Sequence, residues 1–292
     1  MKTTIKLAVL GAAALAASST ATLAASELPS GALTGLALGA PLPEGVYDLS
    51  IASYGTAGSH SLAYAAPIWL FWSTPWQIAG GRLSLSTYTG VADLWSNNPA
   101  HPIADSFLNT LVEGGVAWNL HNGFNVALHA GAWLPSTQTL PMALGRDYTA
   151  FQGLAAVSYI ANGWNLTAVG GYGSGGGGNP ANQMLLNGTD TKWQSASYTL
   201  DLTASRKYGK LELGSIAYGS WDTDGLKEEH FALGGLVGYD FGSFVAQAKL
   251  GTDVEHSSIH ANGARGDDAK ETRGWLTIIK PLWNPAAEGA LK

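Results

Sequence analysis

The sequence contains no cysteine and few charged residues, and each shortage excludes a class of protein. Without cysteine, neither a disulfide nor a thiolate metal site can form. Charged residues make up 12% of the chain, well below the roughly 25% that is usual in soluble domains. The formal charge of −6 also argues against nucleic acid as a partner, because surfaces that bind nucleic acid are basic.

Long hydrophobic runs are missing as well. After the N-terminus the sequence has no apolar run of about 20 residues, the length that a membrane helix needs. Hydrophobic residues nevertheless reach 46%, and there are 38 glycines. Strands that cross a membrane reconcile these values, because one face is apolar while the other is polar but seldom charged. The 11 tryptophans and 11 tyrosines fit the aromatic girdles of such a barrel.

One hairpin shows the pattern on which the rest of the chain is built. Residues 118–128 read WNLHNGFNVAL, in which apolar and polar residues alternate on both sides of a His-Asn-Gly turn. Asn and Gly tolerate the positive φ of a tight hairpin. The same device returns at residues 158–169, 204–214 and 237–250. Long polar loops separate these hairpins, and short turns that alternate with long loops are typical of a membrane β-barrel.

We therefore predict an all-β fold, a transmembrane antiparallel up-and-down β-barrel of about 12 strands. The expected strands are residues 46–54, 64–72, 82–91, 112–120, 124–134, 148–160, 164–172, 196–206, 211–221, 231–241, 244–254 and 273–283. Pro67 cannot donate a ladder hydrogen bond, so we expect a bulge or weak pairing there. The longest expected loops are residues 92–111, 135–146, 173–193 and 255–270.

The ends of the chain are assigned separately. Residues 1–24 are interpreted as a signal peptide, because Lys2 and Lys6 precede a short apolar core and small residues follow at the cleavage site. Residues 25–44 are an irregular N-terminal lead that we place in the periplasm, with folding back into the lumen as the alternative. The barrel occupies residues 45–283, and residues 284–292 form a C-terminal tail. We expect the mature protein in the outer membrane of a Gram-negative bacterium, with both termini and the short turns in the periplasm.

Three features resemble one family of outer-membrane proteins. They are the phrase PLPEGVY at residues 41–47, the closely spaced hairpins, and a closing strand that ends on Trp283. The family is associated with the meta-pathway of phenol degradation. Over residues 39–283 the resemblance implies a transporter-like barrel linked to the degradation of aromatic compounds, and it implies no catalytic residue.

Alternation divides the strand residues between lipid and lumen. The expected lipid face includes Phe124, Val126, Leu128, Leu200, Leu202 and Phe244. The candidates for lining the lumen and the substrate path are Asp48, Arg82, Tyr88, Asn125, His129, Tyr159, Asp201, Glu212, Asp240, Gln247 and Lys249. Both charge signs occur among them, so a strongly ion-selective pore is not indicated. The alternative is that these side chains neutralise one another and fill a narrow lumen.

The predicted function is a channel or transporter that passes small, weakly polar, aromatic compounds of the phenol type into the periplasm. A loop-borne binding or adhesion barrel is the alternative, and an outer-membrane hydrolase is a further one. For a hydrolase, His129 and Ser158 lie on consecutive strands, and residues 255–258 combine Glu, His and Ser in a loop. Neither set supplies a clear Ser–His pair with a third group to orient the histidine.

The remaining chemistry is sparse. The seven histidines are scattered, so we expect no metal site and no cofactor, and we predict that the protein is not an enzyme. The expected partners are outer-membrane lipid and small hydrophobic or aromatic solutes. The oligomeric state stays open.

Overall fold

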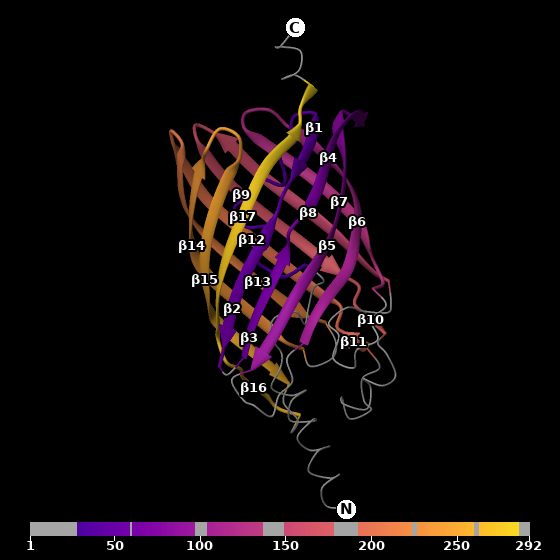
Figure 1. Ribbon diagram of the computed structural model, residues 1–292, viewed down its shortest axis with the longest axis vertical. Helices are drawn as coiled ribbons and strands as arrows, with labels where there is room; N and C mark the ends of the chain where they lie inside the picture. Colours follow the sequence, from indigo (N-terminus) through magenta and orange to yellow (C-terminus); the bar gives the residue numbers. More distant parts are fainter. Residues whose placement is uncertain are drawn as a thin grey trace, which may run out of the picture.

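The computed structural model describes residues 28–58, 60–96, 104–136, 149–177, 192–223, 227–259 and 263–285. They form a closed barrel of 12 antiparallel strands (Figure 1), which confirms the predicted fold. Among these residues no helix is long and apolar enough to cross a membrane. The expected signal peptide, and the part of the expected tail beyond residue 285, lie outside the described residues.

The first two barrel strands are each interrupted, and the others are continuous. The first consists of β1 (Gly45–Asp48) and β2 (Ile51–Ala57), and the second of β3 (His60–Ala66) and β4 (Trp69–Ile78). The others are β5 (Gly81–Ser96), β6 (Ala104–Asn119), β7 (Phe124–Leu134), β8 (Ala150–Ala161), β9 (Trp164–Gly173), β12 (Ser197–Tyr208), β13 (Leu211–Asp222), β14 (Glu229–Asp240), β15 (Val245–Ile259) and β17 (Glu271–Trp283). The wall closes where β17 pairs with β15 on one side and with β1 and β2 on the other.

Three short strands lie apart from this ring. β10 (Gly176–Gly177) pairs with β11 (Lys192–Gln194), and β16 (Arg265–Asp267) pairs with the last residues of β15. All three lie at the end of the barrel opposite to the C-terminus (Figure 1). This end, which we call the loop end, carries the longer connections between strands. The opposite, short-turn end carries tight turns.

Two of the tight turns consist of two residues that both have positive φ. Asn162 and Gly163 have φ of 53° and 80°, and Ala79 and Gly80 have φ of 50° and 80°. Two positive φ values in succession are what the type I′ hairpin turn requires. The first turn was expected from its Asn-Gly sequence. The second was not, because β4 and β5 extend further than predicted and leave only two residues between them.

Alternation on β7 follows the predicted phase. Phe124 and Leu128 are 51% and 58% exposed, whereas Asn125 and His129 are 5% and 6% exposed. The pattern holds because the outer face meets lipid while the inner face meets the interior of the barrel.

Several strands run further than the sequence indicated. β5 continues to Ser96, β6 begins at Ala104, and β15 continues to Ile259, so parts of the loops expected at residues 92–111 and 255–270 are strand. These extensions lack a clear apolar face. Period-two hydrophobicity therefore marks only the part of each strand that faces lipid.

The wall is interrupted at Pro67, as predicted. Between β3 and β4 the Asp48 carboxylate accepts a hydrogen bond from the backbone N–H of Trp69 at 3.2 Å, and Ser50 Oγ donates to the carbonyl of Pro67 at 2.6 Å. Asp48 pairs in register with Leu70, an exposed residue of the outer face. Its prediction as a lumen residue is therefore wrong. Its carboxylate lies on the outer side, where it accepts a backbone N–H at the interruption in the strand pairing.

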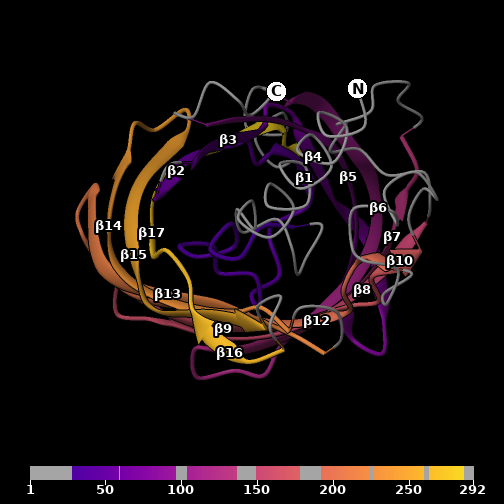
Figure 2. The same ribbon diagram turned by 90° about the horizontal axis from the view of Figure 1, so that it is seen from below.

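Residues 28–44 lie inside the barrel, and we call this segment the plug. Seen along the barrel axis in Figure 2, its indigo trace occupies the space within the ring of strands. Leu28, Leu33 and Leu36 of the plug are buried in one apolar cluster with wall residues such as Ile51 and Leu62. The sequence prediction that this segment lies in the periplasm is thus wrong for residues 28–44, and the alternative position in the lumen is the one observed.

Candidate functional site

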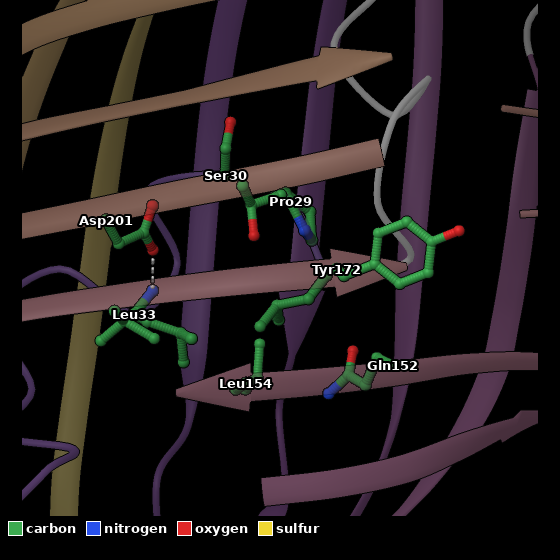
Figure 3. A pocket seen from close by; sticks show the side chains of 10 residues that line it. Pro29, Ser30, Leu33, Gln152, Leu154, Tyr172 and Asp201 are labelled. Atoms are coloured by element: carbon green, nitrogen blue, oxygen red, sulfur yellow. Dashed lines mark hydrogen bonds between the residues drawn. The ribbon is translucent and has the colours of Figure 1, made fainter. Parts of the chain in front are cut away.

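The plug is held first by two side chains of β12. Both oxygens of the Asp201 carboxylate are occupied, one by the N–H of Gly31 at 2.8 Å and the other by the N–H of Leu33 at 2.9 Å. Figure 3 shows the second of these bonds. Thr203 Oγ1 accepts the N–H of Gly35 at 2.7 Å. Asp201 and Thr203 are two residues apart on one strand, so both point inward.

The carbonyl groups of the same turn are held from β15. Lys249 Nζ donates to the carbonyl of Thr34 at 2.7 Å and lies 3.4 Å from that of Ala32 and 3.5 Å from that of Gly31. Only the first of these distances is that of a strong hydrogen bond. A buried carboxylate thus binds the donors of the turn and a buried ammonium binds its acceptors. Hydrogen bonds to charged partners are about twice as strong as neutral ones.

Other wall residues also contact the main chain of the plug rather than its side chains. Asn165 and Gln247 donate to the carbonyl of Gly35, each at 3.1 Å, and Ser158 Oγ accepts the N–H of Gly39 at 3.0 Å. A Cβ atom on Gly39 would lie 2.7 Å from the backbone nitrogen of Ser158. The wall therefore recognises the path of the backbone, and glycine permits the close approach.

A pocket lies between the plug and the wall formed by β8, β9 and β12 (Figure 3). Its lining consists of Leu28, Pro29, Ser30, Leu33, Gln152, Leu154, Val169, Tyr172, Thr199 and Asp201. Gln152 Oε1 accepts from the Trp133 indole at 2.8 Å, and Gln152 Nε2 donates to Glu113 at 2.8 Å. The free volume of the pocket is about 10 Å³, which is room for about one water molecule. Apolar side chains such as Leu33, Leu154 and Val169 share its surface with polar ones such as Thr199 and Asp201.

Aromatic rings cluster inside the wall beside this network. The Trp69 and Tyr88 rings are 4.7 Å apart, and Tyr88 and Trp133 meet edge to face at 5.3 Å. The sequence placed Tyr159 with them, which is wrong. Tyr159 pairs in register with the exposed Phe124, and the two rings lie 5.0 Å apart on the outer face.

The other sequence-predicted site residues fall into two groups. Those buried within the barrel are Tyr88, Asn125, His129, Asp201, Glu212, Gln247 and Lys249. Arg82 and Asp240 are only half-buried near the short-turn end, where Arg82 donates to the carbonyl of Thr74 and Asp240 accepts the N–H of Gly242. These two residues therefore stabilise the rim and its turn.

Sequence reasoning missed Glu113, which is 5% exposed and lies 3.2 Å from Nδ1 of His129. Its parity on β6 is that of Gly115 and Ala117, so alternation alone could have placed it inside. It was missed because its neighbours on the inner face of β6 are small residues, so apolar and polar residues do not alternate clearly along this strand.

The interior also contains a Ser–His–Asp arrangement that joins the plug to the wall. Ser30 Oγ lies 2.8 Å from Nε2 of His230, and His230 Nδ1 lies 3.3 Å from the Asp253 carboxylate. The N–H next to a nucleophilic serine is a common oxyanion donor, but here the N–H of Gly31 binds the Asp201 carboxylate. A negative charge at that place opposes an oxyanion. The arrangement therefore does not support acyl transfer and serves as a link between plug and wall.

The other hydrolase and metal hypotheses also find no support. His129 pairs in register with Leu154, whereas Ser158 pairs with Asn125, so His129 and Ser158 are four positions apart along the sheet. Residues 255–258 lie in β15, where His256 Nε2 is 3.0 Å from Glu228. Burial raises the pKa of Glu228 in the connection before β14, and His256 opposes this rise. Within the described part of the chain, no group of three or more His, Asp or Glu residues is arranged to hold a metal ion.

Comparisons with known proteins agree with this architecture. A family model described as "Putative MetA-pathway of phenol degradation" matches residues 51–264. An outer-membrane channel from Pseudomonas putida F1 has a similar crystal structure, with a TM-score of 0.62 and 13% identity over 83% of this chain and 97% of that one. A monoaromatic hydrocarbon channel, CymD, gives a TM-score of 0.48 and 8% identity over 86% and 92% of the two chains. The likeness to the Pseudomonas channel concerns the fold. No curated protein matches the sequence.

Proposed function

The chain belongs to the family described as the putative MetA-pathway of phenol degradation, and on this basis we propose that it is an outer-membrane channel for small, weakly polar, aromatic solutes of the phenol type. The solutes pass from outside into the periplasm. Residues 1–24 act as the signal peptide that directs the chain to this membrane. In this proposal the protein passes its solute unchanged and is not an enzyme.

The pocket beside the plug is the observation that supports this proposal. Leu33 of the plug and Leu154 and Val169 of the wall all line it, so a ring that enters as the plug shifts exchanges water for apolar contacts. Each Å² of apolar surface that is removed from water contributes about 25 cal/mol. The buried charges nearby, Asp201 and Lys249, are already bound to the plug. The site therefore favours a neutral ring over an ion.

The route past the plug sets the selectivity in this proposal. The pocket lies on the side of Leu28 and Pro29, the described residues of the plug that are furthest in sequence from the first strand. Residues 28–44 lie within the ring of strands (Figure 2). A solute passes only when this segment shifts, which excludes free diffusion of ions and sugars.

Uptake measurements test the proposal. A deletion strain, complemented with the wild-type gene or with Leu154→Trp, is compared for uptake of labelled phenol and toluene and of a labelled sugar. We expect the deletion and the pocket-filling variant to slow the uptake of both aromatics and to leave the sugar unaffected. Heat-modifiable migration on a gel checks that the variant forms a barrel.

Single-channel recording of the purified protein completes the test. Normal uptake of every aromatic in the deletion strain, together with an electrically silent protein, would contradict the channel and favour a loop-borne binding role. Normal aromatic uptake with a large, steady ion conductance would instead identify a general diffusion pore.

A further inference from the structure

We propose that Asp201 couples solute binding to release of the plug, because the hydroxyl group of a phenolic solute in the pocket competes for its carboxylate with the N–H groups of Gly31 and Leu33. This inference rests on the proposed function. It predicts that aromatics with a hydrogen-bond donor open the channel more often than aromatics without one, and it names the residue through which they act.

Among the wall residues that line the pocket, Asp201 is the one whose side chain binds the backbone of the plug. Its two oxygens each accept one N–H, at 2.8 and 2.9 Å. An ionised carboxylate has about four lone-pair sites. The pocket has room for about one water molecule, so a hydroxyl group can bind there before either N–H leaves, and the ring of the solute follows as the plug shifts.

The other polar groups that line the pocket are neutral, including the hydroxyl groups of Thr199 and Tyr172, so this carboxylate is the strongest acceptor there. Both ends of the Gln152 amide are bonded, to Trp133 and to Glu113. Ser30 Oγ is bonded to His230. A phenolic hydroxyl, with a pKa of about 10, stays protonated at neutral pH and acts as a donor. Its bond to a carboxylate is charge-assisted and short.

Toluene supplies the natural comparison, because it has nearly the shape of phenol and no donor. It can reach the apolar side chains of Leu154 and Val169 as the plug shifts, but it has no donor to take the place of either N–H group on Asp201. One hydrogen bond to a charged group corresponds to a factor on the order of ten to one hundred in an equilibrium constant. The equilibrium constant for release of the plug should therefore be larger by that factor with phenol than with toluene.

Release at Asp201 frees the part of the plug that matters for passage. The turn at residues 31–35 is held between Asp201 on β12 and Lys249 on β15. Without the carboxylate, the N–H side of the turn has lost its charged partner and Lys249 alone retains the carbonyl side. The turn can then swing towards β15 and widen the space beside β8 and β9.

The first experiment records ion conductance of the purified full chain in a planar bilayer. Asp201→Asn is compared with wild type, and Asp267→Asn, an exposed residue on β16, removes the same charge away from the plug. We expect phenol to raise the open probability of the wild type and Asp267→Asn about tenfold over an equal concentration of toluene. Asp201→Asn should open without solute and should respond equally to both.

The second experiment needs no change at Asp201. Because the chain has no cysteine, Leu36→Cys places its only thiol in the buried plug. Phenol should accelerate its reaction with a water-soluble maleimide about tenfold, and toluene should not. This readout remains valid if Asp201→Asn fails to form a heat-modifiable barrel.

The outcomes separate the inference from the function on which it rests. Equal effects of phenol and toluene on wild-type conductance and labelling would overturn the coupling, while uptake of both that depends on the protein would leave the channel intact. A difference between phenol and toluene that persists in a folded Asp201→Asn barrel would also overturn it. If neither solute crosses, both proposals fail.

Discussion

Replacing Lys249 by methionine should loosen the plug and destabilise the barrel. Methionine keeps the length of the side chain but loses the ammonium group that donates to the Thr34 carbonyl at 2.7 Å. A hydrogen bond to a charged group contributes about 1.5–3 kcal/mol, and a buried carbonyl that is left unbonded costs about 1–3 kcal/mol. We expect the free energy of unfolding to fall by about 1.5–3 kcal/mol.

Unfolding by urea in phospholipid vesicles, followed by tryptophan emission, measures this change. Lys207→Met is the control, because Lys207 is exposed at the end of β12 and surface substitutions usually stay within about 0.5 kcal/mol. The turn of the plug joins Lys249 to Asp201, so the two substitutions should not be additive. Lys249→Met combined with Asp201→Asn should be less destabilising than the sum of the two single variants by about 1–3 kcal/mol.

Two results would refute the reasoning. If Lys249→Met unfolds like Lys207→Met, the ammonium group does not hold the plug. If the double variant loses the full sum of both single effects, the two charged groups act independently of one another. In the first case the other contacts of the plug would retain it, and in the second the turn would not couple Lys249 to Asp201.

The remaining predictions test the two faces of the wall, the plug and the strand break. Leu128→Arg should lower the free energy of unfolding in vesicles by about 2–4 kcal/mol if its site lies near the bilayer midplane. Leu128→Ala should lower it far less. Equal losses would mean that the outer face is assigned wrongly. Gly39→Ala should lower the free energy of unfolding by about 1–3 kcal/mol because its Cβ has no room. Gly170→Ala should have little effect, because a Cβ there would have nothing within 4 Å. A larger loss for Gly170→Ala than for Gly39→Ala would contradict the path of the plug along the wall. Asp48→Ala should cost about 1–3 kcal/mol, since the backbone N–H at the break loses its acceptor, and Asp48→Asn should restore part of this; an unchanged midpoint for Asp48→Ala would show that water satisfies the break.

Most of the wall could be predicted because its chemistry is periodic. The turn after Asn119 and the alternation from Phe124 to His129 were evident from the sequence, since lipid selects one face and the lumen the other. The strand ends beyond the lipid region, such as Ser96 and Ile259, could not be predicted, because both faces of the strand meet polar surroundings there.

The plug could not be predicted, and its presence also explains one of the errors at the site. Residues 28–44 have no periodicity, and their partners Asp201 and Lys249 lie about 170 and 215 positions away. The plug brings leucines into the lumen, so Tyr47 and Ile51 turn inward to meet it. An apolar interior reverses the usual alternation on these strands, and Asp48 was therefore assigned to the wrong face.

Recognition of the plug through its main chain has a consequence for how this protein can evolve. Wall side chains bind carbonyl and N–H groups of Gly31, Gly35 and Gly39, and every residue type offers the same carbonyl. Outside its glycines and its buried leucines, mutations that keep the path of the backbone can therefore accumulate in this segment with little effect on how the wall holds it. Over long divergence the plug should lose recognisable similarity well before the acidic and basic wall residues that hold it, and those residues would be the better markers for finding the same device in distant relatives.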